Sequence, residues 1–191
     1  MIWVAHPKEN SFCEALADSY QVGVKEVGAE VRFMRLADMN FDANAQSAYE
    51  PDRPELEPDL IAWQEAIIWA DHLMIVHPYW WGGMPGQAKV VFDRALTPGF
   101  AFKYHEGKKL TWDKLLKGKT MEGIITSDAP PLLDSLLFKK PGRQVLKKMI
   151  FEFCGVKVKK IHQFGSVKTS SVKQRQAWLN KVRQLGEKVA R

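Results

Sequence analysis

The chain has 191 residues, of which 46% are hydrophobic and 26% are charged. This length is typical of one domain, and this composition excludes a disordered chain. No apolar run approaches the roughly 18 residues that a membrane span needs. The two cysteines, Cys13 and Cys154, belong to no C-x-x-C or His/Cys cluster, so neither a disulfide scaffold nor a zinc site is expected.

The charge is unevenly distributed along the chain. Residues 1–138 carry a net charge of −7 and residues 139–191 carry +13, which together give the formal balance of +6. In the basic third, lysines alternate with valine and isoleucine at 156–161, in a pattern typical of a strand. This favours a solvated basic face, or a field that attracts a phosphate-bearing cosubstrate, over a nucleic-acid or membrane surface. With only two cysteines and no disulfide pattern, a reducing cytosol is the default, and the start of the chain shows no signal-peptide pattern, so we expect a cytoplasmic protein.

The first half is predicted to contain, in order, a strand, a helix, a strand, a long loop and a helix, at residues 2–5, 11–27, 30–36, 37–58 and 60–70. Ser11 with Glu14 three residues later predicts a capping box at the start of the first helix. The inner stripe of this helix is expected to be Phe12, Leu16, Gly23 and Val27.

The second half continues the alternation, with strands predicted at 72–77, 119–127 and 156–164, and helices at 85–96, 141–154 and 171–190. Residues 97–118 form an aromatic and basic excursion between them. The closing helix has an apolar stripe made of Trp178, Val182, Leu185 and Val189.

Five strands alternating with five helices indicate an α/β protein in which a doubly wound parallel sheet has helices on both faces, as one domain over 1–191. In such a sheet, ligands bind beyond the carboxyl ends of the strands. Three loops leave predicted strands at such ends, at 6–11, 77–85 and 126–131. We expect them to converge on one crevice.

The first loop offers His6, Lys8, Asn10 and Ser11 ahead of a helix N-terminus, whose free N–H groups and dipole favour an anion. The loop contains no glycine, so it is neither a Walker A loop nor a G-x-G-x-x-G loop. A plain helix cap would explain the same residues equally well.

The second loop carries Trp80 and Trp81 between prolines and glycines, where both rings cannot be buried cheaply. Flat apolar side chains and exposed N–H groups suit an isoalloxazine ring, and a hydrophobic protein interface is the alternative. The third loop, Thr126-Ser127-Asp128, could supply hydroxyls and amides to the far edge of such a ring, or could be an ordinary turn.

Taken together, several segments resemble the flavin-dependent NAD(P)H:quinone oxidoreductases, a family with a flavodoxin-like fold. They are residues 5–12, 39–41, 77–85, 92–94, 99–104 and 153–156. The resemblance implies that the flavin phosphates are held by His6, Asn10, Ser11 and Phe12. It also implies that the flavin ring is lined by Pro78, Tyr79, Trp80, Trp81, Thr126, Ser127 and Asp128.

The resemblance further implies a homodimer in which Phe102 and Tyr104, on the excursion 97–118, reach over the neighbouring subunit's site. Together with Trp81 they would contact the substrate. The cofactor implied is FAD, with FMN as the alternative, and NAD(P)H is the cosubstrate. Well-known members have Thr-Thr-Gly-Gly after the fourth strand, followed by a tyrosine and a histidine that assist hydride transfer, whereas this chain has Thr126-Ser127-Asp128-Ala129-Pro130-Pro131.

The expected activity is hydride transfer from NAD(P)H through the flavin to a quinone or a similar two-electron acceptor. The main alternative is a flavin-bound regulatory subunit, for example of a transport protein, with the basic segment 139–191 as its contact face. A one-electron carrier of the flavodoxin type is disfavoured because such carriers are usually acidic, whereas this chain is basic. No metal site is expected, because no two histidines are spaced i, i+4. The five histidines are His6, His72, His77, His105 and His162.

Overall fold

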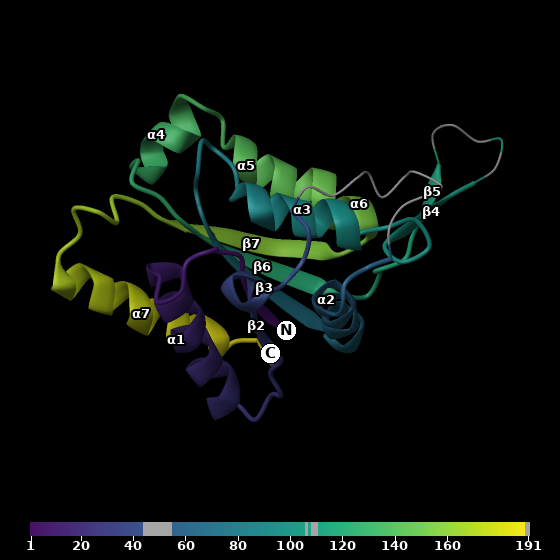
Figure 1. Cartoon of the computed structure of the whole chain (residues 1–191). Helices are drawn as coiled ribbons and strands as arrows, with labels where there is room; N and C mark the ends of the chain where they lie inside the picture. The colour runs from purple at the N-terminus through teal and green to yellow at the C-terminus, as the bar shows by residue number, and fades with distance from the viewer. Residues whose placement is uncertain (44–54, 106, 108–110, 190–191) are drawn as a thin grey trace.

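The computed structural model, which describes residues 1–43, 55–105, 107 and 111–189, has a five-stranded parallel sheet at its centre (Figure 1). The strand order is β2-β1-β3-β6-β7, and every neighbouring pair in this sheet is parallel. The strands span Phe33–Arg35 (β2), Ile2–Val4 (β1), His72–Pro78 (β3), Thr120–Thr126 (β6) and Lys157–Phe164 (β7). The predicted doubly wound α/β fold is confirmed.

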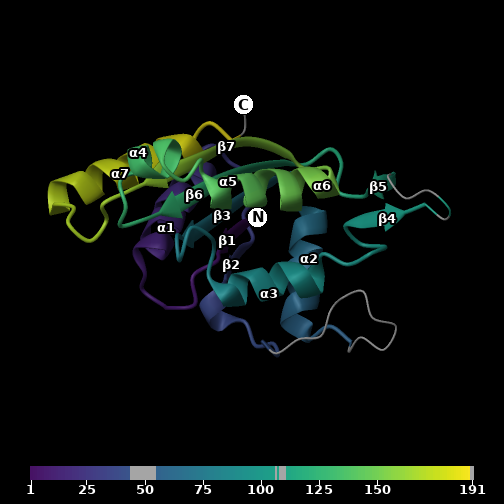
Figure 2. The ribbon, with the colours of Figure 1, turned by 90° about the horizontal axis from the view of Figure 1, so that it is seen from above.

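Helices cover both faces of the sheet (Figures 1 and 2). One face packs against α1 (Phe12–Glu26) and α7 (Val172–Gly186). The other face carries α2 (Pro58–Trp69), α3 (Gly86–Ala95) and a continuous helical run of α5 (Pro141–Gln144), η2 (Val145–Phe151) and α6 (Glu152–Cys154). From β1 the strand order runs to β2 on one side and to β3, β6 and β7 on the other, so the topological switch point, where ligands bind in folds of this kind, lies between β1 and β3.

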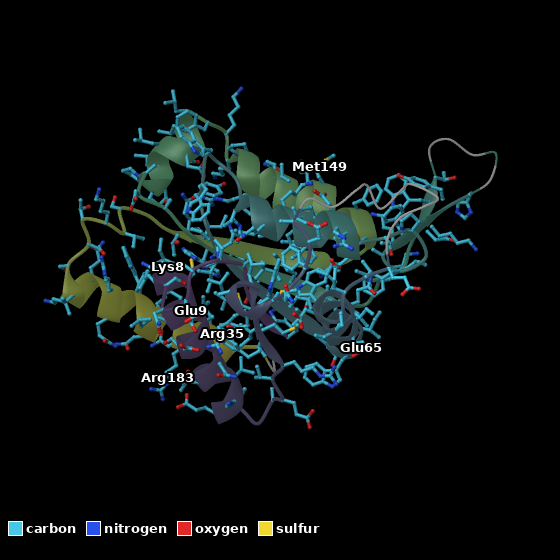
Figure 3. All side chains as sticks on the ribbon, in the orientation of Figure 1. Lys8, Glu9, Arg35, Glu65, Met149 and Arg183 are labelled. Atoms are coloured by element: carbon cyan, nitrogen blue, oxygen red, sulfur yellow. The ribbon has the colours of Figure 1, made fainter. Side chains whose placement is uncertain are left out.

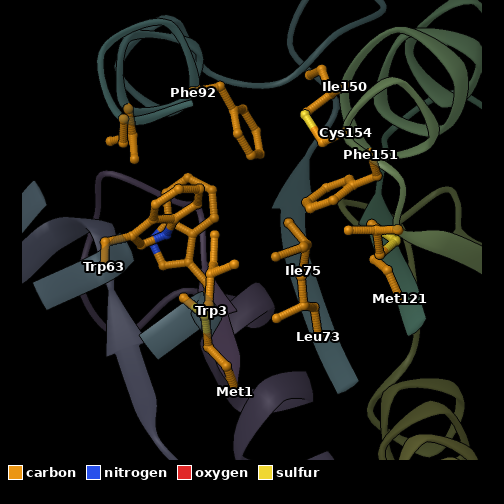
Figure 4. Packing of buried hydrophobic residues seen from close by; sticks show 14 of the residues in the cluster. Met1, Trp3, Trp63, Leu73, Ile75, Phe92, Met121, Ile150, Phe151 and Cys154 are labelled. Carbon is orange, nitrogen blue, oxygen red and sulfur yellow. The ribbon is translucent and has the colours of Figure 1, made fainter. Parts of the chain in front are cut away.

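Aromatic rings pack edge to face within the core on the α2 and α3 face (Figure 4). Trp3 on β1 meets Trp63 and Phe92 edge to face, with ring centroids 5.3 Å away in both cases. Trp3 and Trp63 are fully buried. Since β1 and β3 are covered on both faces, their sequences are continuous apolar runs, which is what made these strands recognisable.

Glycines allow α1 and α7 to pack in contact. A Cβ on Gly23 would lie 2.0 Å from the carbonyl oxygen of Arg183, and a Cβ on Gly186 would lie 2.3 Å from that of Tyr20. The backbones therefore touch where the two helices cross. Gly23, predicted to face inward, does so because no larger residue fits there.

The structure departs from the predicted elements in several places. The second strand is shorter than 30–36, and residues 36–38 form a 3-10 turn, η1 (Leu36–Asp38). A short helix, α4 (Pro131–Leu136), was not predicted, although Pro131 in its first turn is a typical start. The helix predicted over 141–154 contains the π-helical segment η2. One residue per turn is added there, so the apolar spacing that predicted an α-helix is shifted.

The excursion predicted at 97–118 contains a two-stranded antiparallel ribbon, β4 (Phe102–Tyr104) with β5 (Trp112–Lys114). It stands out at one end of the molecule in both views (Figures 1 and 2). Parts of three predicted segments lie outside the described residues: 44–54 of the long loop, 106 and 108–110 of the excursion, and the last residues of the closing helix. Among the described residues, no helix is long and apolar enough to cross a bilayer.

Candidate functional site

The first loop joins β1 to α1 and ends in a helix cap. Ser11 Oγ accepts a hydrogen bond from the N–H of Glu14 at 3.2 Å, as the capping-box prediction required. The Glu14 carboxylate, however, accepts from the N–H of Asn10 at 2.7 Å, one residue before the cap. Its second oxygen pairs with Arg35 on β2 at 2.8 Å. The carboxylate at this helix start is therefore compensated by a cation, which lessens its repulsion of an anionic ligand.

His6 lies at the root of the same loop, and its Nδ1 accepts a hydrogen bond from the N–H of Lys8 at 3.0 Å. Burial, and next the charge of Lys8, lower the pKa of His6. The His6 ring meets the ring of Trp80 edge to face at 5.7 Å, so the first and second loops touch. Figure 3 labels Lys8 and Glu9, which extend from this loop beside α1.

The second loop is a tight turn with the tryptophans at its tip. Trp80 and Gly83 exchange both backbone hydrogen bonds, at 2.9 and 3.1 Å. The two residues between them, Trp81 and Gly82, have φ values of 52° and 76°, the sign pattern of a type I′ turn. Trp81 is fully exposed and Trp80 is half-exposed. The turn therefore presents two flat apolar surfaces to solvent, as the sequence predicted for this loop.

The third loop is tied to the first two. The N–H of Tyr79 donates to the carbonyl of Thr126 at 2.7 Å, and Thr126 Oγ1 lies 3.2 Å from Cys13 Sγ in α1. Ser127 Oγ donates to the carbonyl of Ala129 at 2.8 Å. Asp128 Oδ1 accepts from the N–H of Lys168 at 3.0 Å, so the carboxylate is turned toward the loop after β7.

These loops enclose one cleft of about 170 Å³ at the carboxyl edge of the sheet. Seven of the predicted site residues line it: His6, Phe12, Pro78, Tyr79, Thr126, Ser127 and Asp128. Asn10, Ser11, Trp80 and Trp81 lie on the loops around it rather than in its wall. The predicted convergence of the three loops is therefore observed in the structure.

Two wall residues were missed by sequence reasoning, Cys13 and Val167. Val167 lies in the loop after β7, where Ser166 has a φ of 57°. It could have been found, because the carboxyl ends of all the parallel strands meet at the same edge of a sheet. Cys13 belongs to no motif that would mark it as part of a site. Burial raises its pKa to about 12, so it is a wall of the cleft and not a nucleophile.

Phe102 and Tyr104 line no part of this cleft. Phe102 is buried and packs on Phe153 at 5.2 Å, whereas the Tyr104 ring is half-exposed on the ribbon. Of this predicted pair, only Tyr104 presents its ring to the exterior.

A larger cavity of about 370 Å³ lies at the opposite edge of the sheet, near Met1, Tyr20 and His72. Strands of this sheet begin there, while α1 and α2 end there. Helix C-termini carry partial negative charge and disfavour a phosphate, so the smaller cleft is the better candidate for an anionic cofactor. Among the described residues, no group of three or more His, Cys, Asp or Glu side chains could hold a metal ion.

The chain is similar to known proteins over nearly its whole length. Residues 1–188 match a family described as having a flavodoxin-like fold. An uncharacterized NAD(P)H oxidoreductase of Haemophilus influenzae is 30% identical over 189 residues, covering 94% of this chain and 89% of that protein.

Solved structures are similar over nearly the whole chain. Smu.1420 of Streptococcus mutans has a TM-score of 0.83 with 27% identity, covering 98% of each chain. An NAD(P)H:quinone oxidoreductase of Methanothermobacter marburgensis has a TM-score of 0.78 with 23% identity, covering 98% of this chain and 96% of that one. An FMN-dependent NADH-azoreductase of Bacillus anthracis, solved with FMN, has a TM-score of 0.73 with 21% identity, covering 100% of this chain and 98% of that one. The chain therefore belongs to the flavodoxin-like family that includes the NAD(P)H oxidoreductases.

Proposed function

We propose that this protein is a flavin-dependent oxidoreductase that passes two electrons from NAD(P)H to a quinone or a similar acceptor. The observation that carries the proposal is the single cleft made by the loops after β1, β3 and β6. It has a helix N-terminus on one side and an exposed tryptophan turn on the other. The names of the similar proteins, NAD(P)H oxidoreductase and NAD(P)H:quinone oxidoreductase, support the same activity.

The chemistry of the site fits a flavin. The start of α1 offers backbone N–H groups and the positive end of a helix dipole to a phosphate. The hydroxyls of Thr126 and Ser127, with the loop amides, are suited to the polar edge of an isoalloxazine ring. The cleft, at about 170 Å³, is smaller than the roughly 300 Å³ at which ligand pockets usually begin. It would therefore enclose only part of a flavin, and the exposed faces of Trp80 and Trp81 would support the rest.

A bound flavin would supply the hydride chemistry that no side chain of this cleft can perform. The role of the chain is then to bind and orient. Ser11 and the first turn of α1 would fix the phosphate end, and Tyr79 with Ser127 would fix the ring edge. Burial raises the pKa of Tyr79, so this hydroxyl stays protonated at neutral pH and can remain a hydrogen-bond donor.

We propose FMN as the flavin, in place of the FAD to which the sequence resemblance leaned. The B. anthracis azoreductase of the same fold was solved with FMN. A cleft that encloses only part of a flavin also offers no space for an additional adenosine.

We also propose that the protein works as a homodimer. A cleft that encloses only part of a flavin leaves the remaining surface to be covered by another chain. Tyr104 on the projecting ribbon is half-exposed, and large apolar side chains of the α4 region are exposed as well: Leu132, Leu136, Leu137 and Phe138. Burial of such a patch favours association. Sedimentation analysis of the purified protein tests this, because a monomer at micromolar concentration would contradict it.

The decisive experiment is an absorption spectrum of the purified protein, followed by mass analysis of the released cofactor and by turnover of NAD(P)H with a simple quinone. A flavin spectrum with rapid turnover is expected. A bound flavin with negligible turnover would instead favour a regulatory subunit.

Trp81→Ala tests the placement of the ring. Because Trp81 is fully exposed, its removal is expected to leave the melting temperature unchanged and to weaken flavin binding about tenfold, or about 1.4 kcal/mol. Ile68→Ala, which removes another exposed apolar side chain on the distant helix α2, is the matched control. Equal flavin affinity in the Trp81 variant and the wild type would contradict the placement.

A further inference from the structure

The start of α5 is built against the second loop. A Cβ on Gly142 would lie 2.5 Å from the carbonyl oxygen of Gly82 and 2.6 Å from Cε1 of the Tyr79 ring. The next residue, Arg143, donates its backbone N–H to Tyr79 Oη at 3.1 Å. Tyr79 is thus held at both ends. Its backbone N–H donates to Thr126 in the sheet, and its ring hydroxyl accepts from a helix start 64 residues further along the chain.

The side chain of Arg143 is linked to the third loop through Gln163. Its Nη2 donates to Gln163 Oε1 on β7, and Gln163 Nε2 in turn donates to Ser127 Oγ at 3.0 Å. The same Nη2 lies 3.5 Å from Asp134 Oδ2 on α4. Arg143 therefore contacts the ring-bearing loop through its backbone, and its side chain is linked to the hydroxyl-bearing loop through Gln163.

This arrangement is largely buried. The side chain of Asp134 is 6% exposed and that of Arg143 is 20% exposed. A buried ion pair often adds little net stability, because desolvation offsets the attraction, but it fixes geometry. The planar guanidinium, with several donors in fixed directions, suits such a role better than a lysine would. The π-helical segment η2 begins two residues after Arg143, and such segments frequently occur at functional sites.

We propose that Arg143 is a positioning residue that holds Tyr79 and Ser127 together in the arrangement that receives the edge of the flavin ring. This inference rests on the proposed function and adds a residue that lies outside the cleft wall. It also gives α4 and α5 a role: they supply Asp134 and Arg143, and so brace the two loops that follow the neighbouring strands β3 and β6. Burial, and next the charge of Asp134, raise the pKa of Tyr79, and the nearby Arg143 opposes that rise.

The test compares Arg143→Gln with Arg143→Lys. Lysine keeps a positive charge beside Asp134 but lacks the planar guanidinium whose Nη2 reaches both Asp134 and Gln163. We expect Arg143→Gln to lower the melting temperature of the apoprotein and to raise the dissociation constant of FMN, titrated by fluorescence, about tenfold. Arg143→Lys is expected to recover most of the melting temperature while the dissociation constant stays raised. Full recovery of both by lysine would assign Arg143 a purely structural role and overturn the proposal.

A double-mutant cycle with Ser127→Ala gives a second readout. Since Arg143 acts on Ser127 through Gln163, the two substitutions are expected to weaken FMN binding less together than the product of their separate effects. Independent, multiplicative effects would contradict the connection. Arg183→Gln is the matched control: its guanidinium pairs with Glu26 on the exposed face of α1 and α7, and FMN affinity should be unchanged.

The two hypotheses fail in different ways. If the wild-type protein binds neither FMN nor FAD, the proposed function is wrong. If the wild type binds a flavin and Arg143→Gln binds it equally tightly, only the positioning role is wrong.

Discussion

The histidine at the end of β3 makes the folded protein sensitive to acid. His77 is 1% exposed, and its Nδ1 lies 2.8 Å from the carbonyl oxygen of Pro78, so the neutral ring donates there. Burial lowers the pKa of His77 to about 4, and the hydrogen bond to Pro78 opposes this only in part. The ring is therefore neutral in the folded protein and titrates near pH 6.5 once the chain unfolds.

The direction of the effect follows from the protons bound in each state. Between about pH 4 and pH 6.5 the unfolded chain binds a proton at this position and the folded chain does not, so stability falls as the pH falls through that window. Each pKa unit corresponds to about 1.4 kcal/mol, which makes the loss attributable to His77 roughly 2 kcal/mol at about pH 5. Above pH 6.5 the ring contributes no pH dependence.

The assay is urea unfolding followed by tryptophan fluorescence, on protein freed of cofactor so that ligand release does not contribute. His77→Asn provides the comparison, because an amide can still donate to Pro78 but does not titrate. The pKa values of His72 and His162 are also lowered to about 4, mainly by burial, so the wild type has a slope from these residues too. The difference between wild type and variant isolates His77.

We expect the wild type to lose roughly 2 kcal/mol more than the variant between about pH 7.5 and pH 5, and the two curves to be parallel at higher pH. Parallel curves over the whole range would refute the reasoning, because they would mean that His77 has the same pKa in the folded and the unfolded chain.

Two further substitutions test the packing. Gly23→Ala places a methyl group against the carbonyl of Arg183 and should lower the free energy of unfolding by about 1–3 kcal/mol in urea. The control Gly86→Ala has open space around it and should be neutral, so equal stability of the two variants would count against the close helix contact. The side chain of Arg94 is 4% exposed and pairs with that of Glu57, which is 27% exposed. Arg94→Met should therefore lower the free energy of unfolding by about 2 kcal/mol at neutral pH, which is less than the loss of about 3–5 kcal/mol expected when a fully buried pair is broken. Thermal and urea unfolding measure that loss, and an unchanged midpoint would show that Glu57 is readily rehydrated.

The sequence by itself determined the architecture and the edge at which the site lies. The apolar runs of β1 and β3 are recognisable because strands buried on both faces can carry few polar residues. Once the sheet is parallel, the loops after its strands must converge, whatever their own sequences. The cap formed by Ser11 was likewise predictable, because its partner is three residues away.

Tertiary structure decided which side chains hold those loops in place. Glu14 bonds to Asn10 and pairs with Arg35, and Tyr79 meets Arg143 across 64 residues. The burial of Phe102 and the π-helical turn after Arg143 were also decided at this level. These contacts leave no periodic pattern, because each depends on where distant segments meet once the sheet has formed. Local spacing determines how each segment folds, whereas only the packed structure determines which of its polar groups face one another.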